Sequence, residues 1–276
     1  MDDRPLPPAE AFDSRVARTT VTSFRMIEAL EGGGYAGVSQ LAADLSLSKG
    51  TVHKHLTTLR ELGYVVREDG QYRLSLAFLG LGTSVRGRTE LYEVSRDHLA
   101  NLAEATEEVA SVMVPERHWG VYLSHTRSAG VESATRREGE RVPLTATAGG
   151  KVILAHLPDD ERDRILDERG LPALTENTVT DRDELLAELR TARDNRFAHD
   201  RGELEPDRHC VAAPITGPDG TAVAAVTVSG PAERMTEKAT RLDFPSIVGS
   251  TATAIQNRLG RERSDDGPAD SGEGQL

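Results

Sequence analysis

The sequence of 276 residues has one cysteine, four lysines and no run of 18 apolar residues. The single cysteine, Cys210, excludes an intramolecular disulfide and a zinc site built from several cysteines. The lack of a long apolar run excludes a helix that crosses a membrane. Residues 1–18 are proline-rich and charged, unlike a secretory signal. We therefore expect a cytoplasmic protein with no membrane partner, bound metal or cofactor.

Charge is distributed unevenly along the chain. Residues 1–88 hold eleven basic and ten acidic residues, whereas residues 89–276 hold 22 basic and 35 acidic residues. The acidity therefore belongs to the second part, and the length fits two domains. A near-neutral first part leaves nucleic-acid binding open for it, although the whole chain has a net charge of -12. Dense carboxylates, and 29 arginines against four lysines, lead to the hypothesis of a halophilic source.

Residues 39–62 have the pattern of a helix-turn-helix. Ser39 is placed to cap a short helix that ends near Leu45, and Ser48 to cap a second helix that ends near Leu62. Apolar residues recur on the second helix at i, i+4 and i+7, so one face packs on the core and small, basic and hydroxyl residues face outward. Such side chains contact bases and phosphates in the major groove. The residues that we expect to contact DNA from this helix are Ser48, Lys49, Gly50, Thr51, His53, Lys54 and Thr57.

A predicted β-hairpin follows this helix. After the helix-ending Gly63, strand patterns at residues 64–67 and 71–74 flank an Asp-Gly pair, which is a strong two-residue turn signal. A hairpin in this place is the wing of a winged helix-turn-helix, and it brings Arg67 and Arg73 near DNA phosphates. The same elements could also form a protein-interaction module that does not bind DNA.

The segment after the hairpin, residues 76–88, has a partly apolar helical stripe interrupted by glycines. Because each glycine destabilises a helix by about 1 kcal/mol relative to alanine, this helix needs packing partners, and a second subunit would supply them. The remaining chain alternates between helix and strand periods, which indicates an α+β domain with a largely antiparallel sheet. The predicted helices are 91–106, 150–155, one opening near 159, 183–195 and 236–259, and the predicted strands are 109–114, 121–125, 211–215 and 222–229.

The predicted organisation has five parts. They are a disordered tail (1–16), a winged helix-turn-helix domain (17–75), a linker helix (76–89), an α+β domain (90–260) and a second disordered tail (261–276).

Several motifs in this order resemble the IclR-type transcriptional regulators, from about residue 17 to residue 258. In the helix-turn-helix they are Leu41-Ala42, the Lys-Gly-Thr-Val-His run at 49–53, and Tyr-Arg-Leu at 72–74. In the second domain they are the segment 141–151, which ends in Ala-Gly-Gly-Lys, the segment 200–214, and Val-Thr-Val-Ser-Gly-Pro at 226–231. The resemblance implies a winged-helix DNA-binding domain, a linker helix and a GAF-like effector-binding domain, assembled as a dimer or a dimer of dimers.

The resemblance also implies where an effector binds. The family's pocket positions fall here on Leu144, Ala148, Gly149, Asp200, Cys210, Thr227 and Ser229, with Val152 and Arg208 as neighbouring wall positions. The residues themselves are compatible with this, since backbone N–H groups at a helix start suit a carboxylate, and Thr227 and Ser229 share one face of a strand. Alternatives stay open: the small residues could only allow close packing, Cys210 could fill the core, and Asp200 could belong to a solvated acidic surface.

We expect a sequence-specific transcription regulator that binds double-stranded DNA at a palindromic operator and is controlled by a small organic acid. The alternative is a ligand-sensing protein whose winged domain binds another protein. Catalysis is disfavoured, because His209 and Cys210 are adjacent on a strand and so point to opposite faces. The Gly-Gly-Lys at 149–151 lacks phosphate-loop spacing, and His53 and His55 do not share a helix face as metal ligands would.

Overall fold

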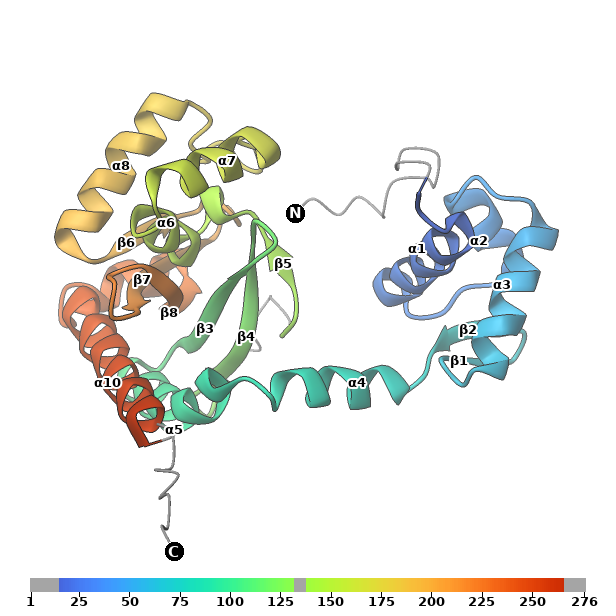
Figure 1. Cartoon of the computed structure of the whole chain (residues 1–276), viewed down its shortest axis with the longest axis horizontal. Coiled ribbons are helices and arrows are strands. Elements are labelled where there is room, and N and C mark those ends of the chain that lie inside the picture. Colours follow the sequence, from blue (N-terminus) through green and yellow to red (C-terminus); the bar gives the residue numbers. More distant parts are fainter. Residues whose placement is uncertain (1–14, 132–137, 266–276) are drawn as a thin grey trace, which may run out of the picture. The chain divides into compact units, whose positions relative to one another are not determined.

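The computed structural model describes residues 15–131 and 138–265 (Figure 1). They form two compact units that divide between Val85 and Arg86, inside the segment for which a linker is predicted. Most of the two predicted disordered tails, residues 1–14 and 266–276, lies outside the described residues. No helix in the described part of the chain combines the length and apolarity that a membrane crossing requires.

The first unit is a winged helix-turn-helix. Its elements are α1 (Arg18–Gly33), α2 (Val38–Asp44), α3 (Lys49–Glu61), β1 (Val65–Glu68) and β2 (Gln71–Leu74). Ser48 caps α3 as predicted, since its hydroxyl oxygen accepts a hydrogen bond from the N–H of Thr51. The predicted cap at Ser39 is wrong, because the carbonyl of Gly37 already accepts the first helical hydrogen bond, from Leu41.

The hairpin closes as predicted. Asp69 and Gly70 both have positive φ, 48° and 83°, as a type I′ turn requires. Val52, Leu56 and Leu59 of α3 are buried in the core of this unit, so the opposite face of α3 is turned outward.

The predicted linker helix is α4 (Ala77–Arg86), and none of its residues is buried. Most of its large apolar side chains lie in solvent: Leu79 is 65%, Leu81 51% and Val85 69% exposed, and the preceding Leu76 is 80% exposed. Phe78 is half-buried against the ring of Tyr64.

The second unit is α+β, with an antiparallel sheet of six strands in the order β5-β4-β3-β8-β7-β6. The strands are β3 (Val109–Glu116), β4 (Trp119–Arg127), β5 (Arg141–Val142), β6 (Ala198–Arg201), β7 (Arg208–Thr216) and β8 (Ala222–Pro231), and the helices are α5 (Glu90–Thr106), α6 (Ala148–Ala155), α7 (Asp159–Arg169), α8 (Arg182–Asn195), α9 (Ala232–Lys238) and α10 (Phe244–Asp265). The sequence analysis missed β5 and β6, which are short and largely polar and therefore show no strand period.

Helices cover both faces of this sheet (Figure 1). One apolar cluster joins α5 and α10 to the sheet, and another joins α6, α7 and α8 to the opposite face. Every residue of α6 is buried. Close packing of α6 depends on Gly150, because a Cβ at that position would lie 2.1 Å from the carbonyl oxygen of Leu144.

The single closing helix predicted for residues 236–259 is wrong, because the chain forms two helices there, α9 and α10. Lys238 ends α9, and its buried ammonium donates to the carbonyl oxygens of Thr106 and Glu107. Asp243 restarts the helix by accepting a hydrogen bond from the N–H of Ser246. The second helix also continues to Asp265, past the predicted domain end at 260.

Candidate functional site

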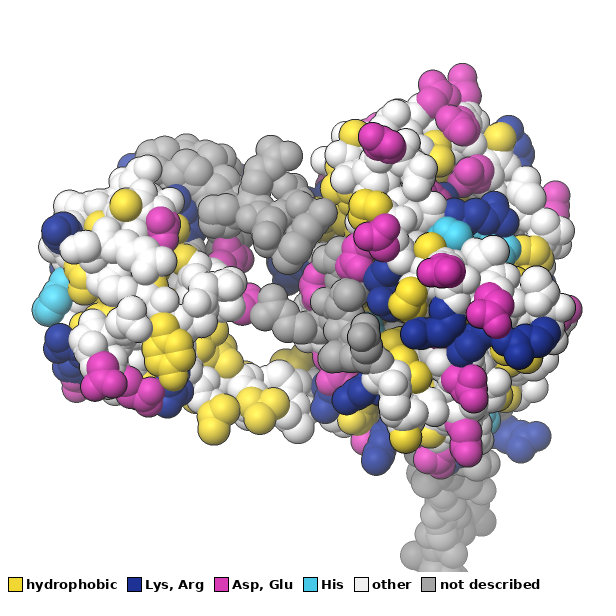
Figure 2. Space-filling model, turned by 180° about the vertical axis from the view of Figure 1, so that it is seen from behind, with side chains coloured by type: hydrophobic (Ala, Val, Ile, Leu, Met, Phe, Trp, Pro, Cys, Tyr) yellow, Lys and Arg dark blue, Asp and Glu magenta, His cyan; other side chains and the backbone are white. Residues whose placement is uncertain are grey.

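The outer face of α3 carries the predicted DNA-contacting residues. Lys49, Gly50, His53 and Lys54 are exposed, and Thr57 is half-buried. The hydroxyl groups of Ser48 and Thr51 lie 2.8 Å apart and bond to each other at the helix start. In Figure 2, Lys, Arg and His side chains lie along one edge of this unit. The face is therefore basic and rich in hydrogen-bond donors.

The two wing arginines differ in their surroundings. Arg67 is exposed, and its guanidinium carbon lies 5.7 Å from the centre of the Tyr72 ring. Arg73 forms a 2.5 Å ion pair with Glu68, and this bond lowers the pKa of the Glu68 carboxyl. Arg67 is thus available to bind a phosphate, whereas Arg73 has to release Glu68 before it can bind one.

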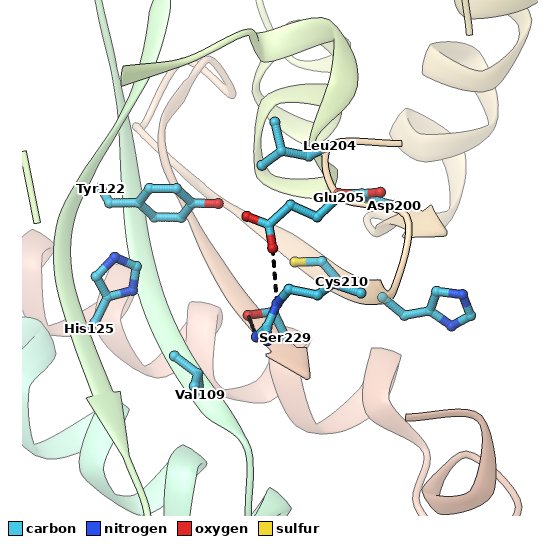
Figure 3. A pocket seen from close by; sticks show the side chains of 10 residues that line it. Val109, Tyr122, His125, Asp200, Leu204, Glu205, Cys210 and Ser229 are labelled. Carbon is cyan, nitrogen blue, oxygen red and sulfur yellow. Dashed lines mark hydrogen bonds and ion pairs between the residues drawn. The ribbon is translucent and has the colours of Figure 1, made fainter. Parts of the chain in front are cut away.

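A pocket opens on the second unit at one end of the sheet (Figure 3). The free space in it is about 30 Å³, which holds about one water molecule. Its lining residues are Val109, Tyr122, His125, Asp200, Leu204, Glu205, Arg208, His209, Cys210 and Ser229.

Three of the predicted effector residues line this pocket, and the strand register explains why they meet. Asp200 of β6 lies opposite Cys210 of β7, and Cys210 lies opposite Ser229 of β8. Directly opposed residues of antiparallel strands point to the same face. A carboxyl, a thiol and a hydroxyl therefore form one row across three strands.

Sequence analysis missed Tyr122 and His125, which form the opposite wall of the pocket (Figure 3). Residues three apart on a regular strand point to opposite faces. Here Ser124 pairs with Val112 and Tyr122 with Met113, so one extra residue bulges from β4 between them. The bulge turns Tyr122 and His125 to one face, with ring centres 4.7 Å apart. No sequence period marks such a bulge.

The other predicted effector residues, Leu144, Ala148, Gly149 and Thr227, are fully buried and do not line this pocket. Gly149 and Thr227 are close, since a Cβ on Gly149 would lie 3.1 Å from the Thr227 methyl carbon and 3.0 Å from the Met113 sulfur. The Met113 sulfur therefore packs against the start of α6. The alternative that the small residues allow close packing holds for Gly150.

Asp200 does not belong to a solvated acidic surface. Its side chain is 6% exposed and accepts a 2.7 Å hydrogen bond from the N–H of Glu203. Burial raises the pKa of Asp200 to about 7. Cys210 is half-buried: it lines the pocket and also packs against the apolar cluster of α6, α7 and α8, and burial raises the pKa of its thiol. The pocket thus offers a largely neutral thiol and a carboxyl that titrates near neutral pH.

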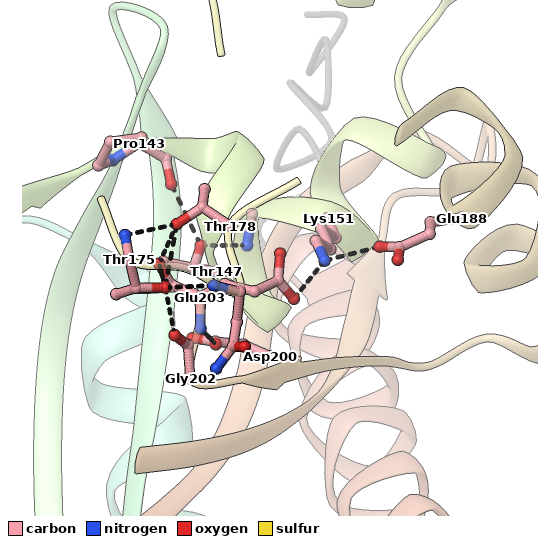
Figure 4. A network of polar contacts seen from close by, with 11 residues as sticks. Pro143, Thr147, Lys151, Thr175, Thr178, Glu188, Asp200, Gly202 and Glu203 are labelled. Carbon is pink, nitrogen blue, oxygen red and sulfur yellow. Dashed lines mark hydrogen bonds and ion pairs between the residues drawn. The ribbon is translucent and has the colours of Figure 1, made fainter. Parts of the chain in front are cut away.

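A buried ion-pair network lies beside the pocket (Figure 4). Lys151 of α6 is 2% exposed, and its ammonium lies 2.5 Å from Glu203 and 2.7 Å from Glu188 of α8. Burial raises the pKa of Glu203, while Lys151 acts in the opposite direction. Because the N–H of Glu203 bonds to Asp200, this network ties α6 and α8 to the pocket wall.

One cationic side chain, Arg208, enters the pocket at the start of β7. Its Nε lies 3.7 Å from the carboxylate of Glu205, and its Nη2 lies 3.5 Å from the hydroxyl oxygen of Ser229. In the ranges 15–131 and 138–265, no three His, Cys, Asp or Glu side chains are grouped as a metal site would need.

Comparison with known proteins connects these observations. Residues 22–69 match the IclR helix-turn-helix domain, and residues 83–257 match the C-terminal domain of the bacterial transcriptional regulator IclR. The HTH-type transcriptional regulator KdgR of Escherichia coli is 28% identical over 239 residues, which cover 86% of this chain and 90% of that protein.

Solved structures agree with these matches. The crystal structure of IclR from Thermotoga maritima aligns with a TM-score of 0.70 and 28% identity, covering 88% of this chain and 98% of that chain. An IclR homologue from Microbacterium hydrocarbonoxydans, complexed with 4-hydroxybenzoate, shares the fold, with a TM-score of 0.68, 23% identity and coverage of 82% and 92%. The fold and the basic face of α3 define a helix-turn-helix transcriptional regulator. The chain belongs to the IclR family.

Replacing Asp200 with asparagine is expected to remove a pH dependence of stability. The folded state raises the pKa of Asp200 from 3.8 to about 7, so it holds this proton more tightly than the unfolded chain does. Stability from this group is complete below pH 4 and is lost as the pH rises through 7, by up to about 4 kcal/mol. Chemical denaturation at pH 5.0 and 8.5 should show that the free energy of unfolding of the variant, relative to the wild type, is higher at pH 8.5 than at pH 5.0. A difference in free energy of unfolding between variant and wild type that does not change with pH would contradict this.

Proposed function

We propose that this regulator changes its affinity for a palindromic operator when a small organic acid binds at the pocket row of Asp200, Cys210 and Ser229. The observation that carries the proposal is this row of three polar side chains on one sheet face, with the cationic Arg208 beside it. A few convergent polar groups in a concave site are typical of small-molecule binding.

The organic-acid class is supported by the chemistry of the lining. The Arg208 guanidinium supplies a positive charge, and Ser229 supplies a hydroxyl donor. The Microbacterium homologue of the same fold is complexed with 4-hydroxybenzoate, a carboxylate.

The pocket has to open before such a ligand fits, because its free space holds about one water molecule. The flexible thioether of Met113 packs against Gly149 at the start of α6, and methionine repacks at low cost. We propose that its movement adds Leu144, Ala148, Gly149 and Thr227 to the ligand-binding surface, as the family resemblance implies.

Self-association is supported by α4. Its apolar side chains are exposed, and a helix with two internal glycines needs a packing partner. A second copy of α4 would bury these residues and pair two winged domains, which makes a palindromic operator the expected target. Solution mass measurements distinguish a dimer from a dimer of dimers.

Coupling requires the effector to bind the DNA-competent and DNA-incompetent arrangements unequally. We propose that α4 transmits the difference, since its last residue, Arg86, already belongs to the second unit. Arg86 stacks on the ring of Tyr92 and forms an ion pair with Glu138.

The test is fluorescence anisotropy of the full chain with its own upstream DNA and with scrambled DNA, at low and high potassium salt. The measurement at high salt reproduces the conditions expected for a halophilic source. Counterion release then contributes little to binding, and base contacts have to dominate. Preference for the upstream DNA that changes with 4-hydroxybenzoate or another small acid supports the proposal. No preference in any salt overturns it and favours a protein partner for the winged domain.

Two histidines on α3 give a matched pair of variants. His53 is exposed on the outer face, whereas His55 bonds to the Ser23 hydroxyl of α1 at 2.8 Å, and burial lowers its pKa. We expect His53→Ala to reduce the preference for operator over random DNA about tenfold, the order of one base contact, without changing thermal stability. His55→Ala should lower thermal stability and keep the preference; the opposite pattern would contradict the assignment of the outer face.

A further inference from the structure

We infer that Arg208 selects the anionic group of the effector, and that Glu205 occupies the place of that group while the pocket is empty. The inference deepens the proposed function and rests on it. It assigns a specificity-determining residue outside the row formed by Asp200, Cys210 and Ser229.

Glu205 and Arg208 face each other within one turn of the chain. Glu205 lies in the connection between β6 and β7, and Arg208 is the first residue of β7. The N–H of Arg208 donates to the carbonyl of Glu205 at 3.1 Å, so this turn is closed. Figure 3 shows the Glu205 carboxylate lying in the pocket between Tyr122 and the strand that carries Cys210. The Glu205 side chain therefore fills space that a ligand needs.

The contact between these two side chains is loose. The 3.7 Å separation of Arg208 Nε from the Glu205 carboxylate exceeds the range of a good hydrogen bond. Both side chains keep about a fifth of their surface exposed, 20% and 22%. Partly solvated pairs of this kind contribute little to stability. The contact with Arg208 therefore contributes little to the cost of moving Glu205 aside.

A ligand carboxylate can form a better contact than Glu205 does. The planar guanidinium of arginine can donate two parallel hydrogen bonds to a free carboxylate. Glu205, three residues before Arg208 in the same turn, does not reach this arrangement here. The Ser229 hydroxyl, 3.5 Å from Arg208 Nη2, adds a donor at the same point.

Charge decides between ligands of equal shape. Among the ten lining residues, Arg208 is the one side chain with a permanent positive charge, and Glu205 balances it. An anion that displaces Glu205 restores that balance, whereas an amide or alcohol of the same size leaves Arg208 without a matched partner. The structure thus points to small carboxylates over their neutral isosteres.

Matched acids and amides provide a direct test. Acetate, benzoate and 4-hydroxybenzoate are compared with their neutral isosteres acetamide, benzamide and 4-hydroxybenzamide. Isothermal titration calorimetry of the full chain, in the salt that keeps it folded, gives the association constant of each compound. The affinity ratio of acid to amide within a pair measures the preference for the anion, and a wild type that binds no acid more tightly than its amide overturns the inference.

We expect this affinity ratio to fall about tenfold in Arg208→Gln, the order of one charge pair near a protein surface. Glu205→Gln should raise the ratio several-fold, because it leaves the cation in place and removes the competing carboxylate. The control is Arg190→Gln on the exposed surface of α8, which should leave the ratio unchanged.

An unchanged ratio in Arg208→Gln, or a lower ratio in Glu205→Gln, would overturn the inference. Glu205→Gln keeps the test decisive if Arg208→Gln fails to fold. Operator binding of the same variants without any acid separates the two proposals. Intact operator preference with an unchanged affinity ratio removes the role of Arg208 alone. Absence of operator preference in the wild type removes the regulatory function and leaves the result on acid and amide binding valid.

Discussion

Replacing Lys151 with methionine is expected to lower the free energy of unfolding of the second unit by about 3–5 kcal/mol, the cost of breaking a buried ion pair by removing one partner. Lys151 is 2% exposed and Glu203 is 6% exposed, so the variant leaves a carboxylate in the interior without its 2.5 Å cationic partner. Chemical denaturation of the full chain, followed by circular dichroism, measures the loss.

Two further variants make the Lys151 prediction specific. The double variant Lys151→Met with Glu203→Gln should recover most of the stability, because a neutral amide replaces the unpaired charge. Glu188→Gln should cost at most about 1 kcal/mol, since the Glu188 side chain is 44% exposed and water solvates it. A double variant as unstable as the single one would show that packing of the lysine stem, and not its charge, is what matters.

Replacing both Lys49 and Lys54 with alanine is expected to reduce operator affinity about a hundredfold at low salt, because two exposed cations leave the DNA-facing side of α3. The slope of log affinity against log salt should become shallower by about two. At molar salt the loss should shrink, because counterion release then contributes little. Fluorescence anisotropy across a salt series measures all three quantities.

Arg60→Ala is the matched control on the same helix. Arg60 is exposed but forms a 2.9 Å ion pair with the neighbouring Glu61, so much of its charge is already balanced. Its replacement should cost less affinity than that of either lysine. A larger loss for Arg60→Ala than for the lysine pair would place the DNA-binding surface at the other end of α3.

The sequence alone determined the winged domain in most of its detail. A 3.6-residue period identifies Val52, Leu56 and Leu59 as core, and this one assignment turns His53 and Lys54 outward. The turn at Asp69 and Gly70 and the cap at Ser48 are equally local, because each depends on the conformation or hydrogen bonds of a few neighbouring residues. Such features can be predicted without knowledge of the rest of the chain.

The pocket was only partly predictable. Asp200, Cys210 and Ser229 were named through resemblance to a family, and the register of three strands brings them into one row. The resemblance did not show that Leu144 and Gly149 are buried and do not line the pocket. Nor could the pattern of acidic residues around Asp200 show that its carboxyl is buried, because burial depends on the packing of distant segments.

Only the tertiary structure decided the remaining wall of the pocket and its charges. One extra residue in β4 brings Tyr122 and His125 to the same face, and a bulge of this kind arises from pairing with β3. The raised pKa of Asp200 likewise depends on burial by segments far apart in the chain. Sequence periods record which face of an element is apolar, whereas a pocket is made where several elements meet, and its geometry and charges follow from their packing.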